Sequence, residues 1–459
     1  MQHLKRKKIK VISTVFSLLL GKNLYAGGFS LYTESTGYTI GNFAAGVAAE
    51  AFDASTAWYN PAGLALIHEQ QAIVSGVGVL PTTILSGYSQ YNYTESPPYL
   101  EQFANIQGTE NALVPSVYYA KPLLPNLTVA ASLTAPFGLA SNWSPTSAVR
   151  YAGTYSKLLT IDASPEFGLR INDHLSLGAG LDLEYAEVTF NSILGLPNLG
   201  QPANLYDSKS DNHGDSFGVG FHTGLLFMLQ ENHTRFGLNY QSRIAHHFIG
   251  KSELKGRLAD SPMFDNSDAI FSSNDLNSND IQLPDIITFS GYHDLNDRWA
   301  MLGSVVYTGW SVFKNIELHN IAGATITDGL TEVDFISHED YRNTWRAALG
   351  FNYKWNDKWM LRMGGGFDQT PTIDTQRTIR LPDGNRWALS AGAHFQPFAQ
   401  WTMDVGYTYL QALKHITINK LAVLDENNSV YVNATGQAYA SLVGVQINWL
   451  IDKPVVKNS

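Results

Sequence analysis

Large apolar side chains alternate with small or polar ones along much of the chain after residue 68. In the stretch 401–409, the odd positions carry Trp, Met, Val, Tyr and Tyr, and the even positions carry Thr, Asp, Gly and Thr. The stretches 177–185 and 439–449 largely follow the same rule. Because successive side chains of a strand point to opposite faces of the sheet, this pattern predicts β-strands with one apolar face.

Aromatic residues decide between the two classes of β-protein that alternate in this way. A soluble β-sandwich also alternates, but it has no reason to begin and end many strands with Trp and Tyr. Here Trp401, Tyr409 and Trp449 stand at the ends of predicted strands, and aromatic residues make up 12% of the chain. Membrane barrels place such residues in belts at both interfaces, so the pattern favours an outer-membrane barrel.

The connections between the strands give their number. Six short connections rich in Asn, Asp or Pro interrupt the alternation, at 121–126, 172–173, 230–233, 294–297, 355–358 and 396–399. Long segments alternate with them, near 81–112, 138–156, 191–215, 249–281, 318–338, 372–385 and 417–435. Short turns at one end and long loops at the other are typical of outer-membrane barrels. Six turns join twelve strands, and one more strand at each end predicts an all-β, 14-stranded antiparallel transmembrane β-barrel with both ends on the periplasmic side.

Two N-terminal segments lie outside this pattern. Residues 1–26 combine a basic start with a short apolar run, which predicts a cleaved signal peptide; a membrane anchor is the alternative. Residues 27–67 are rich in small side chains and, once 14 strands are assigned, have no strand to join. We therefore predict a plug inside the lumen at 27–67, the barrel at 68–450 and a tail at 451–459. The turn Asn60-Pro61-Ala62 belongs to this plug. The same tripeptide occurs in aquaporins, but there it is present in two copies that begin half-helices, whereas this chain has one copy and no predicted membrane helix.

Composition narrows the function. Removing residues 1–26 takes six of the 30 basic residues and none of the 40 acidic ones, which leaves 24 against 40 and a net charge of −16. Nucleic-acid binding needs a basic face, so no nucleic-acid partner is expected. The chain has no cysteine, which excludes disulfides and thiolate metal sites. After residue 26 there is no apolar run long enough for a membrane helix.

Two of the long segments contain apolar residues that loops in water usually lack. The segment 81–112 holds several Tyr residues with Leu100 and Phe103, and the segment 249–281 holds Phe264 and Phe271 among Asp and Asn. Exposed apolar groups are costly unless they pack on one another or receive an apolar ligand. Both interpretations remain open.

The third predicted strand has a defect. After the alternating stretch 127–134, the chain reads Ala135-Pro136-Phe137-Gly138. Pro136 cannot donate a ladder hydrogen bond and Gly138 has no side chain to pack. Within lipid, backbone outside the ladder needs protein cover or a cavity, which predicts an inward kink and a gap at Pro136 and Gly138. Alternatively, Pro136 is an ordinary strand end at the outer rim.

Several of these segments, taken in order, resemble one family. The matching residues are Gly27-Gly28-Phe29, Asn60-Pro61-Ala62, Thr134 to Leu139, Leu283-Pro284-Asp285 with Ser290-Gly291-Tyr292, Tyr307 to Ser311, Trp345 to Gly350, and Leu381-Pro382-Asp383 with Arg386. The chain is similar to the FadL-type outer-membrane transporters of long-chain fatty acids and other hydrophobic compounds. The resemblance covers essentially the whole mature chain, although no single motif is specific.

The resemblance implies a barrel closed by an N-terminal hatch, passive diffusion of a hydrophobic ligand, and lateral exit at the kinked third strand. In such transporters the first hatch residues reach toward the pocket, which here assigns Gly28 and Phe29 to the pocket or gate. Phe137 of the third strand is assigned to the same pocket or gate. The family's two basic residues are replaced by Glu187 and Ser337.

The replacement of that basic pair bears on the ligand. His338 or Arg342 is the expected substitute for binding a carboxylate. The departure leaves uptake of neutral aromatic hydrocarbons as the alternative function. We also expect contact with outer-membrane lipid and lipopolysaccharide, insertion by the barrel assembly machinery, and a monomer.

Other chemistry is weakly supported by the residues. A barrel enzyme needs a Ser–His or Asp–His set, and Ser290, Ser304 and His222 show no spacing that marks a nucleophile, so no catalytic residue is predicted. A general porin would have charged residues along an open lumen and a constriction loop, and not an N-terminal hatch rich in Gly and Ala, so this function is less favoured. Without cysteine or closely spaced carboxylates, His213 and the pair His246-His247 are predicted to be solvated strand-end residues, not metal ligands, and no metal or cofactor is expected.

Overall fold

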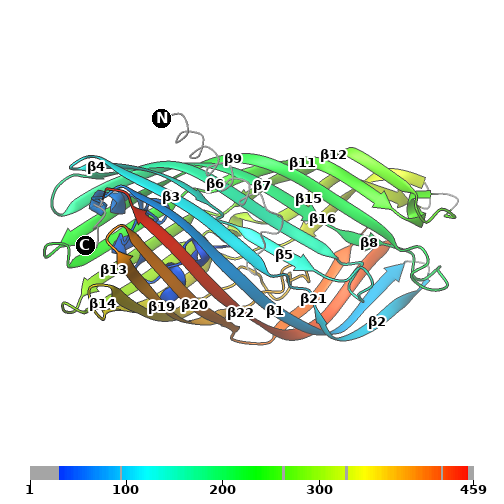
Figure 1. Ribbon diagram of the computed structural model, residues 1–459. Coiled ribbons are helices and arrows are strands. Elements are labelled where there is room, and N and C mark those ends of the chain that lie inside the picture. The colour runs from blue at the N-terminus through cyan, green and yellow to red at the C-terminus, as the bar shows by residue number, and fades with distance from the viewer. Residues whose placement is uncertain (1–29, 94–95, 261–263, 326–328, 425–426, 453–459) are drawn as a thin grey trace.

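The computed structural model describes residues 30–93, 96–260, 264–325, 329–424 and 427–452. The chain forms a closed antiparallel barrel of 14 strands, and the first described residues lie inside it (Figure 1). The predicted fold class is therefore confirmed. Each crossing of the wall consists of one strand, or of two strands separated by a break of a few residues.

The wall runs in chain order. The crossings are β1 (Gln71–Tyr93), β3 (Ala112–Leu124), β4 and β5 (Leu127–Thr134, Gly138–Asn142), β6 (Tyr155–Arg170), β7 (Leu175–Phe190), β9 (Ser208–Leu229), β10 and β11 (Thr234–Gln241, Ile244–Lys255), β12 and β13 (Ile270–Leu283, Ile286–Asp294), β14 and β15 (Trp299–Thr308, Asn315–Thr325), β16 and β17 (Gly329–His338, Thr344–Lys354), β18 (Trp359–Asp368), β19 (Arg386–Phe398), β20 and β21 (Trp401–Ala412, Ile416–Val423) and β22 (Asn428–Leu450). Two accessory strands, β2 (Ser96–Gln107) and β8 (Ser192–Leu194), pair with β1 and β9. Pairing of β22 with β1, from Gln71 opposite Leu450 to Tyr93 opposite Asn428, closes the barrel.

The long connections differ from the prediction. The segments 81–112, 249–281, 318–338 and 417–435, predicted as loops, consist largely of paired strands that extend the wall beyond the membrane. The strand labels β2, β8 and β21 mark this end of the barrel in Figure 1. Outside the bilayer the outward face of a strand is polar, so the alternation that marks a membrane strand is lost there although the ladder continues.

An apolar band surrounds the barrel. On β9 the outward side chains Phe217, Val219 and Phe221 are exposed, as expected for a face that contacts lipid. Two aromatic belts bound the band, one with Tyr307 and Trp345 in ring contact, and the other with Trp401 stacked on Trp449. The short turns lie beyond the second belt, which assigns that end to the periplasm.

The hatch comprises residues 30–67 in the described chain. It consists of short helical turns, η1 (Thr33–Ser35), η2 (Thr39–Gly41), α2 (Val47–Glu50), α3 (Thr56–Tyr59) and η3 (Pro61–Leu66), nearly all of them buried within the periplasmic part of the lumen. Two further turns, η4 (Arg257–Asp260) and η5 (Trp310–Val312), belong to the wall. No helix in the described ranges is long and apolar enough to cross a membrane.

A row of glycines in the wall receives the turn Asn60-Pro61-Ala62. Gly168, Gly178 and Gly224 lie directly opposite one another on β6, β7 and β9. A Cβ atom at Gly178 would lie 2.2 Å from the carbonyl carbon of Pro61, so only glycine permits this approach. The Asn60 side chain accepts a hydrogen bond from the Ala62 N–H (3.1 Å) and donates one to the Leu225 carbonyl (2.9 Å).

Polar side chains of the wall bind two of the buried acids of the hatch. Asn352 donates to Glu50 over 2.7 Å, and Gln446 donates to Asp53 over 2.6 Å. Hydrogen bonds of this kind satisfy carboxylates that burial would otherwise penalise. The hatch is therefore fixed to the wall on several sides.

Candidate functional site

The third crossing breaks between Thr134 and Gly138. Both of its parts pair with β6 on one side, Thr134 opposite Asp162 and Gly138 opposite Leu159. On the other side, β3 pairs with the crossing only from Val117 onward. In the described chain no ladder pairing joins residues 112–116 of β3 to the third crossing. We call the opening between residues 112–116 and 135–137 the window.

The window lies in the outer part of the apolar band. Leu113 of β3 is 53% exposed and stands opposite Gly78, which in turn stands opposite Val443 within the band. On the other edge, the Phe137 N–H donates to the Thr160 hydroxyl over 3.0 Å. The backbone around Pro136 therefore departs from the ladder at membrane depth, where protein must cover it.

The first described residues of the hatch provide that cover. The Leu31 N–H donates to the Pro136 carbonyl over 2.9 Å, and Ser30 forms an isolated bridge with Phe137. The Leu31 side chain packs in one cluster with Ala112, Val114 and Ala135. A Cβ atom at Gly138 would lie 2.9 Å from the Leu31 side chain. Gly28 and Phe29 lie outside the described residues, so their predicted role stays a prediction.

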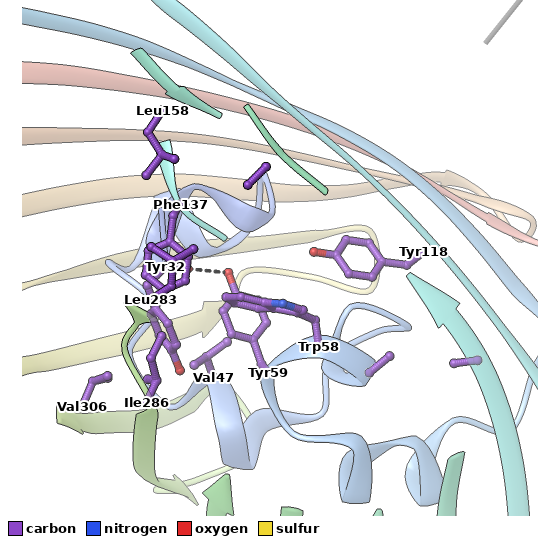
Figure 2. Close-up of a cluster of buried hydrophobic side chains, with 14 of the residues drawn as sticks. Tyr32, Val47, Trp58, Tyr59, Tyr118, Phe137, Leu158, Leu283, Ile286 and Val306 are labelled. Carbon is purple, nitrogen blue, oxygen red and sulfur yellow. Dashed lines mark hydrogen bonds between the residues drawn. The ribbon is translucent and has the colours of Figure 1, made fainter. Parts of the chain in front are cut away.

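An apolar pocket lies above the outer aromatic belt. It is lined by Leu139, Ser156, Lys157, Leu158, Val188, Thr189, Phe190, His246, Phe248, Ile281, Leu283, Phe313, Ile316, Leu318, Glu339, Tyr341, Thr378, Arg380 and Leu381. The apolar lining continues into the cluster that contains Phe137, Leu158 and hatch residue Tyr32 (Figure 2). A hydrogen bond from the Tyr59 hydroxyl to the Tyr32 carbonyl (2.9 Å) braces the hatch beside it.

Arg380 is the exception in this lining. It is 8% exposed, its guanidinium carbon lies 3.5 Å from the ring centroid of Phe190, and one nitrogen donates to the Ser156 hydroxyl over 2.7 Å. No carboxylate in the described ranges lies within salt-bridge distance of it. Burial lowers the pKa of Arg380 to about 9, and the negative charge of Glu339 opposes that shift. The pocket therefore holds a cation whose hydration is lost and incompletely replaced.

The other ionisable groups of the pocket have partners. The Lys157 ammonium lies 2.7 Å from the Glu187 carboxylate. Glu339 accepts a hydrogen bond from Ser337 over 2.7 Å, and burial raises the pKa of Glu339 to about 7. His246, predicted to be a solvated strand-end residue, is instead fully buried and lies 2.8 Å from Glu184. The prediction was wrong because β11 continues inward-facing polar positions beyond the membrane.

The two predicted carboxylate ligands lie elsewhere. His338 is exposed, and its ring lies 2.9 Å from the Asn315 side chain. Arg342 donates to the Thr370 carbonyl and to the Asn385 side chain. Neither lines the pocket, whereas Pro136, Phe137 and Gly138 meet the hatch at the window.

Sequence reasoning missed Arg380. Its signal is a single arginine between Ile379 and Leu381, directly before the Leu-Pro-Asp motif.

Known proteins share this architecture. Residues 17–449 match the family model described as outer membrane protein transport protein (OMPP1/FadL/TodX). The chain is 28% identical to the long-chain fatty acid transport protein of Salmonella typhi over 420 residues, which cover 88% of this chain and 91% of that protein. It is 26% identical to the protein of the same name in Escherichia coli K12, over 88% of this chain and 91% of the relative.

Solved structures agree in fold. A Pseudomonas aeruginosa FadL homologue is 22% identical, with a TM-score of 0.75 over 92% of this chain and 99% of that one. The Pseudomonas putida toluene transporter TodX is 14% identical, with a TM-score of 0.63 over 93% and 98%. The window, the hatch and the matched family model together place this chain in the OMPP1/FadL/TodX family of outer-membrane transport proteins.

Proposed function

We propose that this protein carries long-chain fatty acids across the outer membrane by passive diffusion. The acyl chain binds along the apolar lining of the pocket, and the carboxylate binds Arg380. A shift of the first hatch residues then uncovers the window, through which the ligand leaves sideways. Transfer of apolar surface out of water is favourable by about 25 cal/mol per Å², so binding needs no energy source in the barrel.

The buried guanidinium of Arg380 carries the proposal. A cation removed from water is stabilised by a counter-charge with good hydrogen-bond geometry, and a carboxylate supplies both. Arg380 faces the pocket without such a partner in the described chain, while Lys157 and Arg386 already have theirs. A fatty acid is the ligand class that combines a long apolar chain with one carboxylate.

Uptake of neutral aromatic hydrocarbons is the second candidate. Phe190, Phe248, Phe313 and Tyr341 give the pocket aromatic walls, and TodX, which shares the fold, is a toluene transporter. A neutral ligand would leave the charge of Arg380 without a partner, which favours the fatty acid.

The proposal extends to the membrane environment, insertion and oligomeric state of the protein. We expect the apolar band to contact outer-membrane lipid and lipopolysaccharide, and the barrel assembly machinery to insert the chain. We also propose a monomer, because pairing of β1 with β22 closes the wall within one chain. The match to a family of transport proteins supports transport and not catalysis as its activity.

Binding of labelled oleate to the purified protein tests the function. Replacing Arg380→Gln should weaken binding by about tenfold or more, since a charge-assisted hydrogen bond contributes about 1.5–3 kcal/mol. Arg342→Gln is the matched control, because it removes an arginine outside the pocket and should leave binding unchanged. Toluene competition is measured in parallel. Equal oleate binding by the Arg380 variant and the intact protein, with toluene as the stronger competitor, would favour the hydrocarbon function.

A further inference from the structure

A cluster of four buried carboxylates and two histidines lies on the inner wall between the pocket and the hatch. We propose that this cluster is a proton-loaded latch, in which His222 holds the hatch at Ala57 while protonated and releases it as pH rises. The inference rests on the proposed role of the hatch as a gate. The members are Asp162, Glu166, Asp182, Glu184, His222 and His246.

His222 joins the wall to the hatch. It is fully buried on β9; Nε2 lies 3.1 Å from the Ala57 carbonyl, and Nδ1 lies 2.5 Å from an Asp182 oxygen. A backbone carbonyl only accepts hydrogen bonds, so Nε2 must carry a hydrogen. The contact at Nδ1 then requires either an imidazolium or a protonated Asp182. Both arrangements hold one proton more than a neutral imidazole beside an ionised carboxylate.

Ser164 indicates a second bound proton. Its hydroxyl lies 2.8 Å from an Asp162 oxygen and 3.1 Å from Asp182. One hydroxyl has a single hydrogen to donate, so it satisfies both contacts only when one of the two carboxyl groups is protonated and donates in return. The cluster is therefore held together by shared protons.

No fixed cation neutralises the cluster. Asp162 and Glu166 face His222 from β6, Asp182 and Glu184 from β7, and His246 lies beyond them on β11. Within the described ranges, no arginine or lysine forms a salt bridge with the four carboxylates, and no group of residues there is arranged to hold a metal ion. The adjoining hatch segment 54–60 contains no charged side chain. Protons are thus the available counter-charge.

The other bonds to this part of the hatch do not titrate. Gln241 donates to the Trp58 carbonyl over 3.1 Å, and Asn60 donates to the Leu225 carbonyl over 2.9 Å. Loss of the shared proton leaves a neutral imidazole with one hydrogen for two acceptors, Asp182 and Ala57. Repulsion among the ionised carboxylates adds to this loss, so rising pH weakens the hold on the hatch. His246 lines the pocket and bonds Glu184, which gives protons a route into the cluster.

Pulsed electron paramagnetic resonance on the full chain tests the latch. One nitroxide is placed on the hatch at Leu66→Cys and one on the periplasmic turn at Asp173→Cys, in a chain with no cysteine of its own. The fraction of displaced hatch should rise about threefold or more between about pH 5.5 and 8.5. The double variant His222→Gln with Asp182→Asn keeps a neutral donor for Ala57, so its displaced fraction should no longer depend on pH.

Two controls separate the latch from general loosening. Gln241→Leu removes a neutral bond and should raise the displaced fraction at every pH while keeping the pH response. His394→Gln changes another histidine near the hatch, whose partner Asp404 already pairs with Arg362, and should keep the response intact. Heat-shifted electrophoresis confirms that each barrel is folded.

A displaced fraction that is flat across pH in the intact protein overturns the latch. A pH response that survives in the double variant overturns it as well, and Asp182→Asn alone gives a second reading if the double variant does not fold. Oleate binding is measured on the same samples. If oleate binding is normal and the displaced fraction does not change with pH, only the latch is wrong. If oleate does not bind and the displaced fraction still rises with pH, only the proposed fatty-acid function is wrong.

Discussion

At the residue scale, Arg380 and Glu339 share one apolar pocket without forming an ion pair. The guanidinium rests on the Phe190 ring and Ser156, and the carboxylate is bound by Ser337. Burial raises the pKa of Glu339 to about 7, so Glu339 is neutral in mildly acidic solution and ionised in mildly basic solution. The electrostatic potential at the carboxylate site therefore changes within the physiological pH range.

Oleate affinity should fall as pH rises through about 7. Below that value Glu339 is protonated and leaves Arg380 to the ligand; above it, the ionised Glu339 repels the ligand carboxylate and attracts Arg380. A fatty acid in solution, with an ordinary carboxyl pKa near ~4–5, stays ionised over this range, so the change belongs to the protein. We expect a decrease of about fivefold to tenfold, measured by equilibrium binding. Glu339→Gln should abolish the dependence; a dependence that persists in this variant would assign it to another group.

The sequence predicted the window more fully than the pocket. Pro136 and Gly138 are visible as defects because a proline and a glycine cannot support a central strand. Arg380 gave no such sign, since it belongs to a segment without periodicity. Its burial depends on residues distant in sequence, Phe190 at the end of β7 and Gly153 in the connection before β6. His338 lies one residue from Ser337 and therefore faces the opposite side of β16, and Arg342 lies in the break between β16 and β17, where strand alternation gives no direction.

At the element scale, the hatch packs closely against the wall at positions where the wall residues are glycines and have no side chain. Gly168, Gly178 and Gly224 form a bare row across three strands, and Pro61 and Asn60 fill it. A strand glycine normally weakens a sheet because it packs nothing, so a cross-strand row of them indicates a close approach by another part of the chain. Here that part is the hatch.

Filling the row should loosen the hatch. In Gly178→Val, the new side chain would overlap Pro61 and displace the turn, at a cost of about 1–3 kcal/mol for overpacking. The displaced turn should become sensitive to protease added from the periplasmic side. Gly303→Val is a suitable control, because a Cβ atom there meets its nearest atom at 3.6 Å, in the wall and not the hatch. Equal protease resistance of both variants would show that the row does not hold the hatch.

The break in the third crossing leads us to predict that closing it slows the exit of ligand. Pro136→Ala with Gly138→Val restores a backbone donor and adds a side chain that meets Leu31. If ligand leaves through the window, oleate uptake by cells lacking their own transporter should slow by about tenfold or more while binding is retained. Uptake at the normal rate would place the exit elsewhere.

The strand count was predictable from the sequence, and so was the break in the third crossing, but the other breaks within crossings were not. All six short turns overlap the predicted ones, although residues 121–124 belong to β3 and residues 396–398 to β19. Across the break at 413–415 the inward positions stay on even numbers, so periodicity does not reveal this break. Across 242–243 and 284–285 the inward positions change from odd to even numbers, a shift of one residue that does not by itself mark a break. The extended hairpins were also hidden, since strands outside lipid need no apolar outward face.

At the scale of the whole molecule, the hatch fills a lumen whose diameter is set by the number of strands. Barrels of eight strands are filled by side chains, whereas roughly 16–18 strands leave a water-filled channel. With 14 strands and small inward residues such as Gly364 and Gly406, this lumen would be open without the hatch, which lies against both glycines.

Removing residues 31–66 should therefore convert the protein into a sugar-permeable pore. In liposome swelling, the intact protein should admit little arabinose, because residues 30–67 are nearly all buried against the wall. The shortened protein should admit it at a rate that falls with sugar size, as for diffusion through a fixed channel. The barrel should still fold, since closure depends on the 23 residue pairs between β1 and β22, and heat-shifted electrophoresis checks this. If both proteins swell liposomes equally, sugars pass beside the hatch; if neither does, the outer hairpins and the segment 369–385 close the lumen, and the hatch serves only the window.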